Sequence, residues 1–358
     1  MKKTLVLKVD SQNPELEKIH VAADLIKKGG LVAFPTETVY GLGADALNPT
    51  AVLALFEAKK RPLDNPPIVH VGKVNEVYRL VTEVSPKAKM LMEKFWPGPL
   101  TLIFKRSEIV PKVTVAGLDT IAIRMPKHNV ALALLRESGC PIAAPSANLA
   151  GKPSPTRAEH VLEDLNGRID AILDAGQTNI GVESTVLDLT HDPPQVLRPG
   201  GTPYEDLKKI LKNVELHPVA TAEREVPIEK AHSPGVKHKH YAPRAEVIVV
   251  EGELSAIIDK VKDLAEQHTQ KGLKVGILAT DETTTYYGSY MVKSLGSRSN
   301  LAAIAKNLFR LLREFDQENV DVIIAEGVPP KELGLAVMNR LRRAAGYRIV
   351  KACNRGNC

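Results

Sequence analysis

The sequence predicts two α/β domains joined by a linker, and three observations lead to that prediction. Strand-like and helix-like patterns alternate through about the first 215 residues, which is typical of a sheet with helices packed on it. The pattern stops over residues 213–244, where prolines and basic residues are dense and apolar periodicity is lost. Alternation then resumes, and 358 residues exceed what one typical core requires.

In the first domain, short apolar runs bounded by proline or polar residues predict strands, at 31–34 and in DTIAIRMP, PIAAPSAN and ESTVLDLT. The segment NPTAVLALFEAKK predicts a helix, because Asn48 can cap it and Pro49 suits its first turn. Capping boxes that begin at Thr156 and Thr202 predict two further helix starts. Together these elements indicate a large, twisted, mixed sheet.

After the linker, AEVIVVEG, KVGILAT and VDVIIAEGV predict strands that alternate with predicted helices. Short connections between them predict a small parallel sheet of Rossmann-like form. The segment has no GxGxxG sequence, so a dinucleotide site is not indicated. The predicted boundaries are 1–212 for the first domain, 213–244 for a basic linker and 245–358 for the second domain.

Composition narrows the classes of function. A net charge of +6 permits an anionic partner, either nucleotide or nucleic acid. Aromatic residues are only 4%, which is a poor supply for stacking single-stranded nucleic acid. No apolar run approaches the roughly 18 residues that span a membrane, so no membrane partner is expected. Three cysteines without CxxC spacing favour a reducing, cytoplasmic location.

Polar clusters follow the predicted strands and one helix, and open α/β sheets commonly bind ligands at strand ends. The clusters are FPTETVYGLGAD, KKRPLDNPPIVH, DTIAIRMP, APSANLAGKPSPT, GVESTVLDLT and QVLRPGG. They supply several cations and many neutral donors but no obvious nucleophile. Such a set suits stabilisation of a transferred phosphate by position and charge, without a covalent enzyme intermediate.

Taken singly, these clusters leave alternatives open. FPTETVYGLGAD could be a plain turn, and APSANLAGKPSPT could be an ordinary Ser/Pro-rich loop. Lys59, Lys60 and Arg61 could simply complement the negative end of a helix dipole, but two cations would do that, and Arg61 stands just before Pro62, where the helix should have ended. Strand alternation turns Arg124 away from its apolar neighbours, so its guanidinium needs an anion. That anion is either a bound ligand or the partner in a structural salt bridge.

At this point the sequence resembles a known family. AFPTETVYGLGAD, KKRPLDNPPIVH, WPGPLT, GLDTIAIRMP, IAAPSAN and GVESTVLDL occur in the order of the YrdC-like domain. The linker SPGVKHKHYAP is similar to the one that precedes the small C-terminal domain in the long form of L-threonylcarbamoyladenylate synthases. The resemblance covers essentially the whole chain, and it implies a YrdC-like domain followed by a Rossmann-like domain.

The resemblance implies a nucleotidyltransferase that makes L-threonylcarbamoyladenylate from L-threonine, bicarbonate and ATP and releases pyrophosphate. A threonylcarbamoyl-transferase complex would then modify tRNA at the adenosine beside the anticodon. The chain's contact with tRNA would be indirect. Mg²⁺ would accompany ATP, without ligands that the sequence identifies, and no organic cofactor is expected.

The family's pattern also implies roles for residues of this chain. L-threonine would be bound by Thr38, His70, Arg124, Ala144 and Ser184. ATP would be bound by Arg61, Asn65, Thr120, Ser146, Asn148, Ser154, Arg198 and Tyr241. Lys59 and Arg61 would be the catalytic residues. Because Tyr241 stands far along the chain, the linker would fold back as a lid over the ATP site; a merely flexible basic tether is the alternative.

Other interpretations remain at this stage. His70 could be a core histidine with satisfied hydrogen bonds. The chain could be an RNA-binding protein that uses its basic cavity to recognise shape and phosphates. It could also transfer carbamoyl groups through carbamoyl-adenylate, as YrdC-like modules of hydrogenase maturation proteins do, although the accompanying segments of those proteins are missing here.

Overall fold

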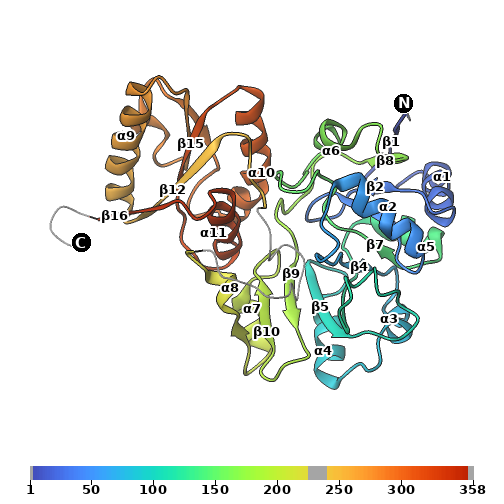
Figure 1. Ribbon diagram of the computed structural model, residues 1–358. Coiled ribbons are helices and arrows are strands. Elements are labelled where there is room, and N and C mark those ends of the chain that lie inside the picture. Colours follow the sequence, from blue (N-terminus) through green and yellow to red (C-terminus); the bar gives the residue numbers. More distant parts are fainter. Residues whose placement is uncertain (1–2, 225–239, 354–358) are drawn as a thin grey trace. The chain divides into compact units, whose positions relative to one another are not determined.

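The computed structural model of the chain describes residues 3–224 and 240–353. The described residues form two compact units, one of residues 3–150 and 154–220 and one of residues 151–153, 221–224 and 240–353. Each unit has its own sheet (Figure 1). Residues 225–239, which hold much of the predicted linker, lie outside the described residues. The boundaries proposed from the sequence stay a prediction.

The first unit contains an eleven-stranded mixed sheet in the order β1-β8-β2-β3-β7-β4-β6-β5-β9-β10-β11. Its strands are β1 (Leu5–Lys8), β2 (Val32–Phe34), β3 (Gly41–Asp45), β4 (Val69–His70), β5 (Leu100–Lys105), β6 (Thr120–Arg124), β7 (Ile142–Ala143), β8 (Ala171–Asp174), β9 (Thr185–Asp188), β10 (Gln195–Arg198) and β11 (Glu215–Leu216). The sheet contains parallel pairs, such as β4–β6, and antiparallel pairs, such as β5–β6. The predicted large mixed sheet is confirmed.

The helices of the first unit pack against the apolar side chains of its strands. They are α1 (Leu16–Lys27), α2 (Pro49–Lys59), η1 (Val74–Glu76), α3 (Val77–Leu80), α4 (Pro86–Phe95), α5 (Asn129–Ser138), α6 (Ala158–Leu165) and α7 (Tyr204–Ile210), with α8 (Pro218–Thr221) at the boundary. Strand alternation sends Val32 and Phe34 into a core with α1 and α5, and Ala33 into a core with α2 and α6. Figure 1 shows α1 and α5 side by side.

Helix starts were predicted with mixed success. Asn48 caps α2, since its Oδ1 accepts hydrogen bonds from the backbone N–H groups of Thr50 and Ala51, and Pro49 begins the helix. Both predicted capping boxes are wrong. Helix α6 is capped by Arg157 without a side-chain bond. The Thr156 amide donates to His160 Nδ1, and its hydroxyl has no hydrogen-bond partner among the described residues. Helix α7 is capped by Pro203.

The failure at Thr202 has a tertiary cause. Its backbone N–H donates to Thr185 Oγ1 at 3.1 Å, and its carbonyl accepts a hydrogen bond from the same hydroxyl. Thr202 is therefore bound to β9, and contacts between distant segments replace the local cap that the sequence pattern suggested.

The second unit contains a five-stranded sheet in the order β14-β13-β15-β12-β16, and all of its pairs are parallel. Its elements are β12 (Glu246–Gly252), α9 (Leu254–Gln270), β13 (Val275–Ala279), η2 (Thr284–Tyr287), β14 (Met291–Ser294), α10 (Leu301–Gln317), β15 (Val322–Glu326), α11 (Leu333–Ala344) and β16 (Ile349–Ala352). Strands β13 and β15 are buried throughout, as expected of strands covered on both faces. The predicted Rossmann-like parallel sheet is confirmed.

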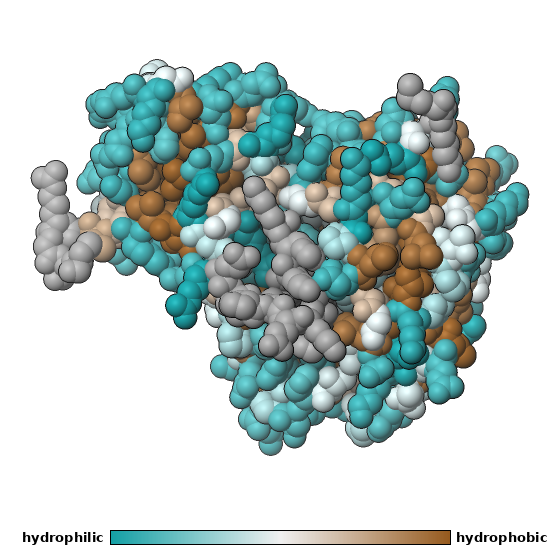
Figure 2. Space-filling view, in the orientation of Figure 1, coloured by the Kyte–Doolittle hydropathy of each residue, from teal (hydrophilic) through white to brown (hydrophobic). Residues whose placement is uncertain are grey.

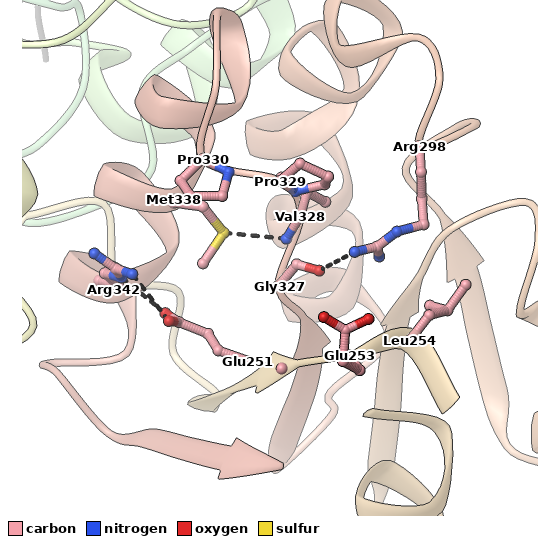
Figure 3. A pocket seen from close by; sticks show the side chains of 11 residues that line it. Glu251, Glu253, Leu254, Arg298, Gly327, Val328, Pro329, Pro330, Met338 and Arg342 are labelled. Atoms are coloured by element: carbon pink, nitrogen blue, oxygen red, sulfur yellow. Dashed lines mark hydrogen bonds and ion pairs between the residues drawn. The ribbon is translucent and has the colours of Figure 1, made fainter. Parts of the chain in front are cut away.

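A cavity of about 420 Å³ lies at the carboxyl ends of β12 and β15 (Figure 3). The chain leaves β12 toward β13 and leaves β15 toward β16, on opposite sides, which is the crevice where open parallel sheets usually bind ligands. Both arginines that line the cavity already have protein partners. Arg342 is paired with Glu251 through two contacts of 2.7 and 2.9 Å, and Arg298 donates to the Gly327 carbonyl at 2.9 Å.

The surface is mainly polar. On the face shown in Figure 2, hydrophilic residues cover most of each unit, and apolar residues form smaller patches between them. Among the described residues, no helix is both long and apolar enough to cross a membrane.

Candidate active site

A polar loop follows β2 and carries Thr36, Glu37 and Thr38, all of which are buried. Thr36 Oγ1 donates to the Val39 carbonyl at 2.7 Å and lies 2.8 Å from Thr38 Oγ1. Because the Thr36 proton is already used, Thr38 must donate in that contact. The loop is fixed from outside by the amide of Ile180, which donates to the Glu37 carbonyl at 2.8 Å. Sequence-distant segments therefore hold these side chains in place.

Arg124 ends β6 and turns toward this loop, as strand alternation predicted. Its side chain is only 4% exposed. Nη1 donates to Thr38 Oγ1 at 3.0 Å, Nε donates to the Gly98 carbonyl at 3.1 Å, and Nη2 lies 2.6 Å from Glu37 Oε2. The anion that the sequence required is thus a carboxylate of the protein in this structure. A salt bridge was one of the two alternatives for Arg124.

His70 ends β4 beside Arg124, with which it is in register on the neighbouring parallel strand. Its ring meets that of Phe34 edge-on, with 6.1 Å between the centroids. Burial, and then the charge of Arg124, lower the pKa of His70 to about 3, so the imidazole is neutral at neutral pH. Among the described residues, Nδ1 has no hydrogen-bond partner although it is buried. A core histidine with fully satisfied nitrogens is therefore not what the structure shows.

Lys59 is the last residue of α2 and is 1% exposed. Its ammonium donates to the carbonyl oxygens of Ser146 and Asn148 in the loop that follows β7. Burial, and then the charge of Arg61, lower the pKa of Lys59 well below its usual value. Lys59 therefore brings two predicted ATP-site residues to the end of α2 and uses two of its three N–H donors to do so.

The two residues after Lys59 lie in different environments. Lys60 is exposed and caps α2 in a left-handed conformation, so it is helix-end charge. Arg61 turns back on its own segment, where Nε donates to the Asn65 carbonyl at 2.9 Å and Nη2 to that of Pro66 at 3.2 Å. Asn65 itself is buried. The guanidinium and the following turn thus form one connected structure.

A second group surrounds the start of β9. Ser184 Oγ lies 2.8 Å from Thr101 Oγ1, and the Arg198 guanidinium donates to the Ser184 carbonyl through Nε and Nη2 at 3.1 and 3.0 Å. A Cβ on Gly200 would lie 2.3 Å from the Glu183 carbonyl, so only glycine allows this close approach. Next to Ser184, the Glu183 carboxylate accepts a hydrogen bond from the buried Ser154 hydroxyl.

In the part of the chain that the structure describes, the three remaining predicted residues have no side-chain hydrogen bond to the groups above. Ala144 donates its backbone N–H to the Ile68 carbonyl at 2.8 Å, close to His70 in sequence. Thr120 begins β6, opposite Lys105 on β5, and is partly exposed. Tyr241 belongs to the second unit, where its ring packs on Phe309 with centroids 5.3 Å apart. The contact of Tyr241 with ATP and the lid stay predictions, and residues 233–239 of the lid lie outside the described residues.

Sequence reasoning gave no role to three residues that the structure brings to the site. Glu37 was counted among the polar residues after β2, but its contact with Arg124 depends on strands far apart in the sequence. His128 lies close enough for Glu37 to act on its pKa, which burial lowers. Glu183 binds Ser154. Their common signal is a polar residue within a few residues of a strand end, and that signal is too weak to assign a role.

The family model called Sua5_yciO_yrdC, whose description is "Telomere recombination", matches residues 24–200. A second model, described as "Threonylcarbamoyl-AMP synthase, C-terminal domain", matches residues 202–346. A threonylcarbamoyl-AMP synthase of Pyrococcus abyssi is 50% identical, with 97% of this chain and 99% of that protein covered.

The chain belongs to the threonylcarbamoyl-AMP synthase family. The Bacillus subtilis member is 49% identical over 93% of this chain and 94% of its own length. A crystal structure of P. abyssi Sua5 complexed with L-threonine matches with a TM-score of 0.93 and 50% identity, covering 98% of this chain and 100% of that one. Members of this family are enzymes, and the resemblance that the motifs suggested is confirmed.

Proposed function

We propose that the chain synthesises L-threonylcarbamoyladenylate from L-threonine, bicarbonate and ATP and releases pyrophosphate. The observation that carries this proposal is the match over nearly the full chain to a family member whose crystal structure contains L-threonine. The convergence of Thr38, His70 and Arg124 in the first unit supports it, because these residues form a buried polar group at the ends of β4 and β6.

For threonine, Arg124 supplies a guanidinium suited to a carboxylate. The Thr38 hydroxyl, the neutral His70 ring, the backbone of Ala144 and the Ser184 hydroxyl complete the proposed threonine subsite. The attacking group is the carbamate formed from threonine and bicarbonate, so the protein has no nucleophile to supply. Its task is to hold two anions together and to exclude water from the carbamate and from the mixed anhydride.

For ATP, the cations of Lys59, Arg61 and Arg198 neutralise the phosphates, and the other ATP-site side chains supply neutral contacts. The latter are Asn65, Thr120, Ser146, Asn148, Ser154 and Tyr241. In the structure Lys59 holds the loop of Ser146 and Asn148 through two N–H groups, so we place its third N–H toward phosphate. Developing charge at the α-phosphorus would then be met by donors that are already in place.

Mg²⁺ would arrive with ATP. The described residues contain no group of three or more His, Cys, Asp or Glu side chains that could hold a metal ion. This fits an ion held mainly by phosphate oxygens and water, which is common for Mg²⁺ bound with nucleotides. The ion would add positive charge at the phosphates, and the protein residues would orient them.

The product would pass to a threonylcarbamoyl-transferase complex that modifies tRNA beside the anticodon, and we propose a cytoplasmic location for this reason. The test is to incubate the protein with all three substrates and to look for the adenylate and pyrophosphate by mass spectrometry, omitting each substrate in turn. Product that requires all three is the expected result. RNA binding without ATP and without product would favour the RNA-binding alternative, which the relatives do not support.

A further inference from the structure

The carboxylate of Glu37 is buried but has too few partners. The side chain is 7% exposed, and its Oε2 lies 2.6 Å from Arg124 Nη2. Neither carboxylate oxygen has a hydrogen-bond partner among the described residues. A buried carboxylate is normally stabilised by several hydrogen bonds as well as by its counter-ion. A buried polar group left unsatisfied in a folded protein calls for an explanation, such as a ligand or a catalytic role.

Threonine carries the donor group that the Glu37 carboxylate lacks. A free amino acid is a zwitterion, with its ammonium on the carbon next to its carboxylate. Glu37 and Arg124 present the opposite charges side by side. If the threonine carboxylate binds Arg124, as the proposed function requires, Glu37 is the carboxylate beside the α-ammonium. Threonine would then replace the Glu37–Arg124 contact by two ion pairs of its own.

We propose that Glu37 binds the α-ammonium of threonine and accepts the proton that this group must lose. This inference rests on the proposed function. An ammonium has no lone pair, so it cannot attack bicarbonate until it is deprotonated. After Glu37 takes one proton, the amine forms the N–C bond with the bicarbonate carbon. One oxygen of bicarbonate leaves as water and carries away the second proton.

The step balances in atoms and charge. Threonine ammonium, bicarbonate and the Glu37 carboxylate become the carbamate, one water and the Glu37 carboxylic acid. No oxidant, reductant or further reactant is needed. The carbamate oxygen then attacks the α-phosphorus of ATP, and no proton on nitrogen moves in that later step. Glu37 is therefore required for the first step and not for the second.

The neighbours of Glu37 fit this role. Arg124 on β6 is the counter-ion of the Glu37 carboxylate before threonine binds. Burial, and then the charge of Arg124, lower the pKa of His70 on β4 to about 3, so its ring is a poor acceptor for the ammonium proton. His128, just before α5, is the other titratable group on which Glu37 acts, and burial lowers its pKa as well. The remaining polar groups of the loop, Thr36 and Thr38, are neutral hydroxyls.

The test compares wild type with Glu37→Gln in both directions of the reaction. In the forward direction, adenylate formation by Glu37→Gln at neutral pH should fall by about 10²-fold or more, the usual contribution of a general base. The deficit should shrink as the pH rises and free amine becomes available. In the reverse direction, ATP formation from purified adenylate and pyrophosphate should stay within about twofold of wild type, since that step moves no proton on nitrogen.

The matched control is Asp188→Asn, which neutralises another buried acid on the same sheet and should leave both directions unchanged. If Glu37→Gln does not fold, Glu37→Asp keeps the charge while withdrawing the carboxylate, and the same forward loss with an intact reverse reaction is expected. A wild-type forward rate in the Glu37 variant overturns the inference. So does an equal, pH-independent loss in both directions, which would mean that Glu37 only positions Arg124. If wild type itself forms no adenylate, the proposed function fails and this inference with it.

Discussion

Each unit buries a glutamate next to an arginine at a strand end, but the two glutamates differ in their hydrogen bonds. Glu326, at the end of β15, is fully buried and accepts from the Thr280 amide at 3.1 Å, from Thr280 Oγ1 at 3.0 Å and from the Tyr287 hydroxyl. Its arginine, Arg298, stands 3.8 Å away.

Glu37 has the reverse arrangement, with a close arginine and, among the described residues, no hydrogen bond. Glu326 is thus a buried carboxylate whose own unit supplies its hydrogen bonds, and Glu37 is one whose hydrogen bonds we expect from a ligand. We therefore assign Glu326 to the stability of the second unit and Glu37 to the chemistry of the first.

The largest effect should come from Glu326→Ala. Its removal leaves Thr280 and Tyr287 with buried donors and leaves Arg298 without its counter-ion, which should cost about 3–5 kcal/mol of unfolding free energy. Glu37→Ala should cost less, about 1–3 kcal/mol, because Arg124 keeps the Gly98 carbonyl and the Thr38 hydroxyl as acceptors. Denaturant unfolding of both variants measures the difference, and equal costs would remove the distinction between the two carboxylates.

The arginines should differ in function. Arg124→Ala removes the proposed partner of the threonine carboxylate, so the KM for threonine should rise by about 10²-fold, which corresponds to about 3 kcal/mol. Arg298→Ala, in the second unit, should leave that KM unchanged. Steady-state pyrophosphate release at varied threonine provides the measurement. A KM unaffected by Arg124→Ala would remove Arg124 from the threonine subsite.

Acid should act on the first unit through His70. Its folded-state pKa of about 3 lies below the ordinary value of 6.5, so the unfolded chain binds the proton more readily. The stability that His70 contributes is complete above pH 6.5 and is lost as the pH falls toward 3. Between pH 7 and pH 5 the expected loss is about 2 kcal/mol.

The control for this prediction is His70→Gln, whose unfolding free energy should fall less over the same pH range. The second unit's Tyr287 keeps its proton throughout, because burial and Glu326 raise its pKa. An identical pH dependence in wild type and His70→Gln would show that the ring is not held neutral.

The smallest effect is expected at Lys60. This side chain is exposed at the end of α2, so Lys60→Ala should change the unfolding free energy by less than about 0.5 kcal/mol and leave adenylate formation unchanged. Lys59→Ala, one residue earlier, removes the donor to the Ser146 and Asn148 carbonyls and should reduce activity. Equal behaviour of the two variants would contradict the division of this segment.

Much of the fold could be predicted from the sequence because its determinants are local. Asn48 and Pro49 specify the start of α2, and alternation in DTIAIRMP gives the buried direction of Arg124 without any tertiary information. The capping box at Thr202 failed because Thr185, on β9, binds its backbone groups. At Thr156 the backbone amide donates instead to His160 in the following turn. Local rules fail where another partner, near or distant in sequence, replaces the expected contact.

The candidate site could be predicted only in part, for the same reason. The order of the motifs identified the candidate residues. Which of them contact one another depends on β2, β6 and β9 lying in one sheet. The sequence left the anion for Arg124 open, and the structure supplies Glu37 from the loop after β2. Likewise, Lys59 stays a prediction for the phosphate site, and the sequence did not show that two of its donors bind carbonyl groups of the loop after β7.

The most direct test of the central claim is to supply isotope-labelled bicarbonate with threonine and ATP and to examine the nucleotide product by mass spectrometry. The predicted product is an adenylate that contains threonine and carries the bicarbonate label in its carbamoyl carbon, formed together with pyrophosphate. An ATP-derived product without threonine or without the label, or the absence of any adenylate, would contradict the proposed reaction.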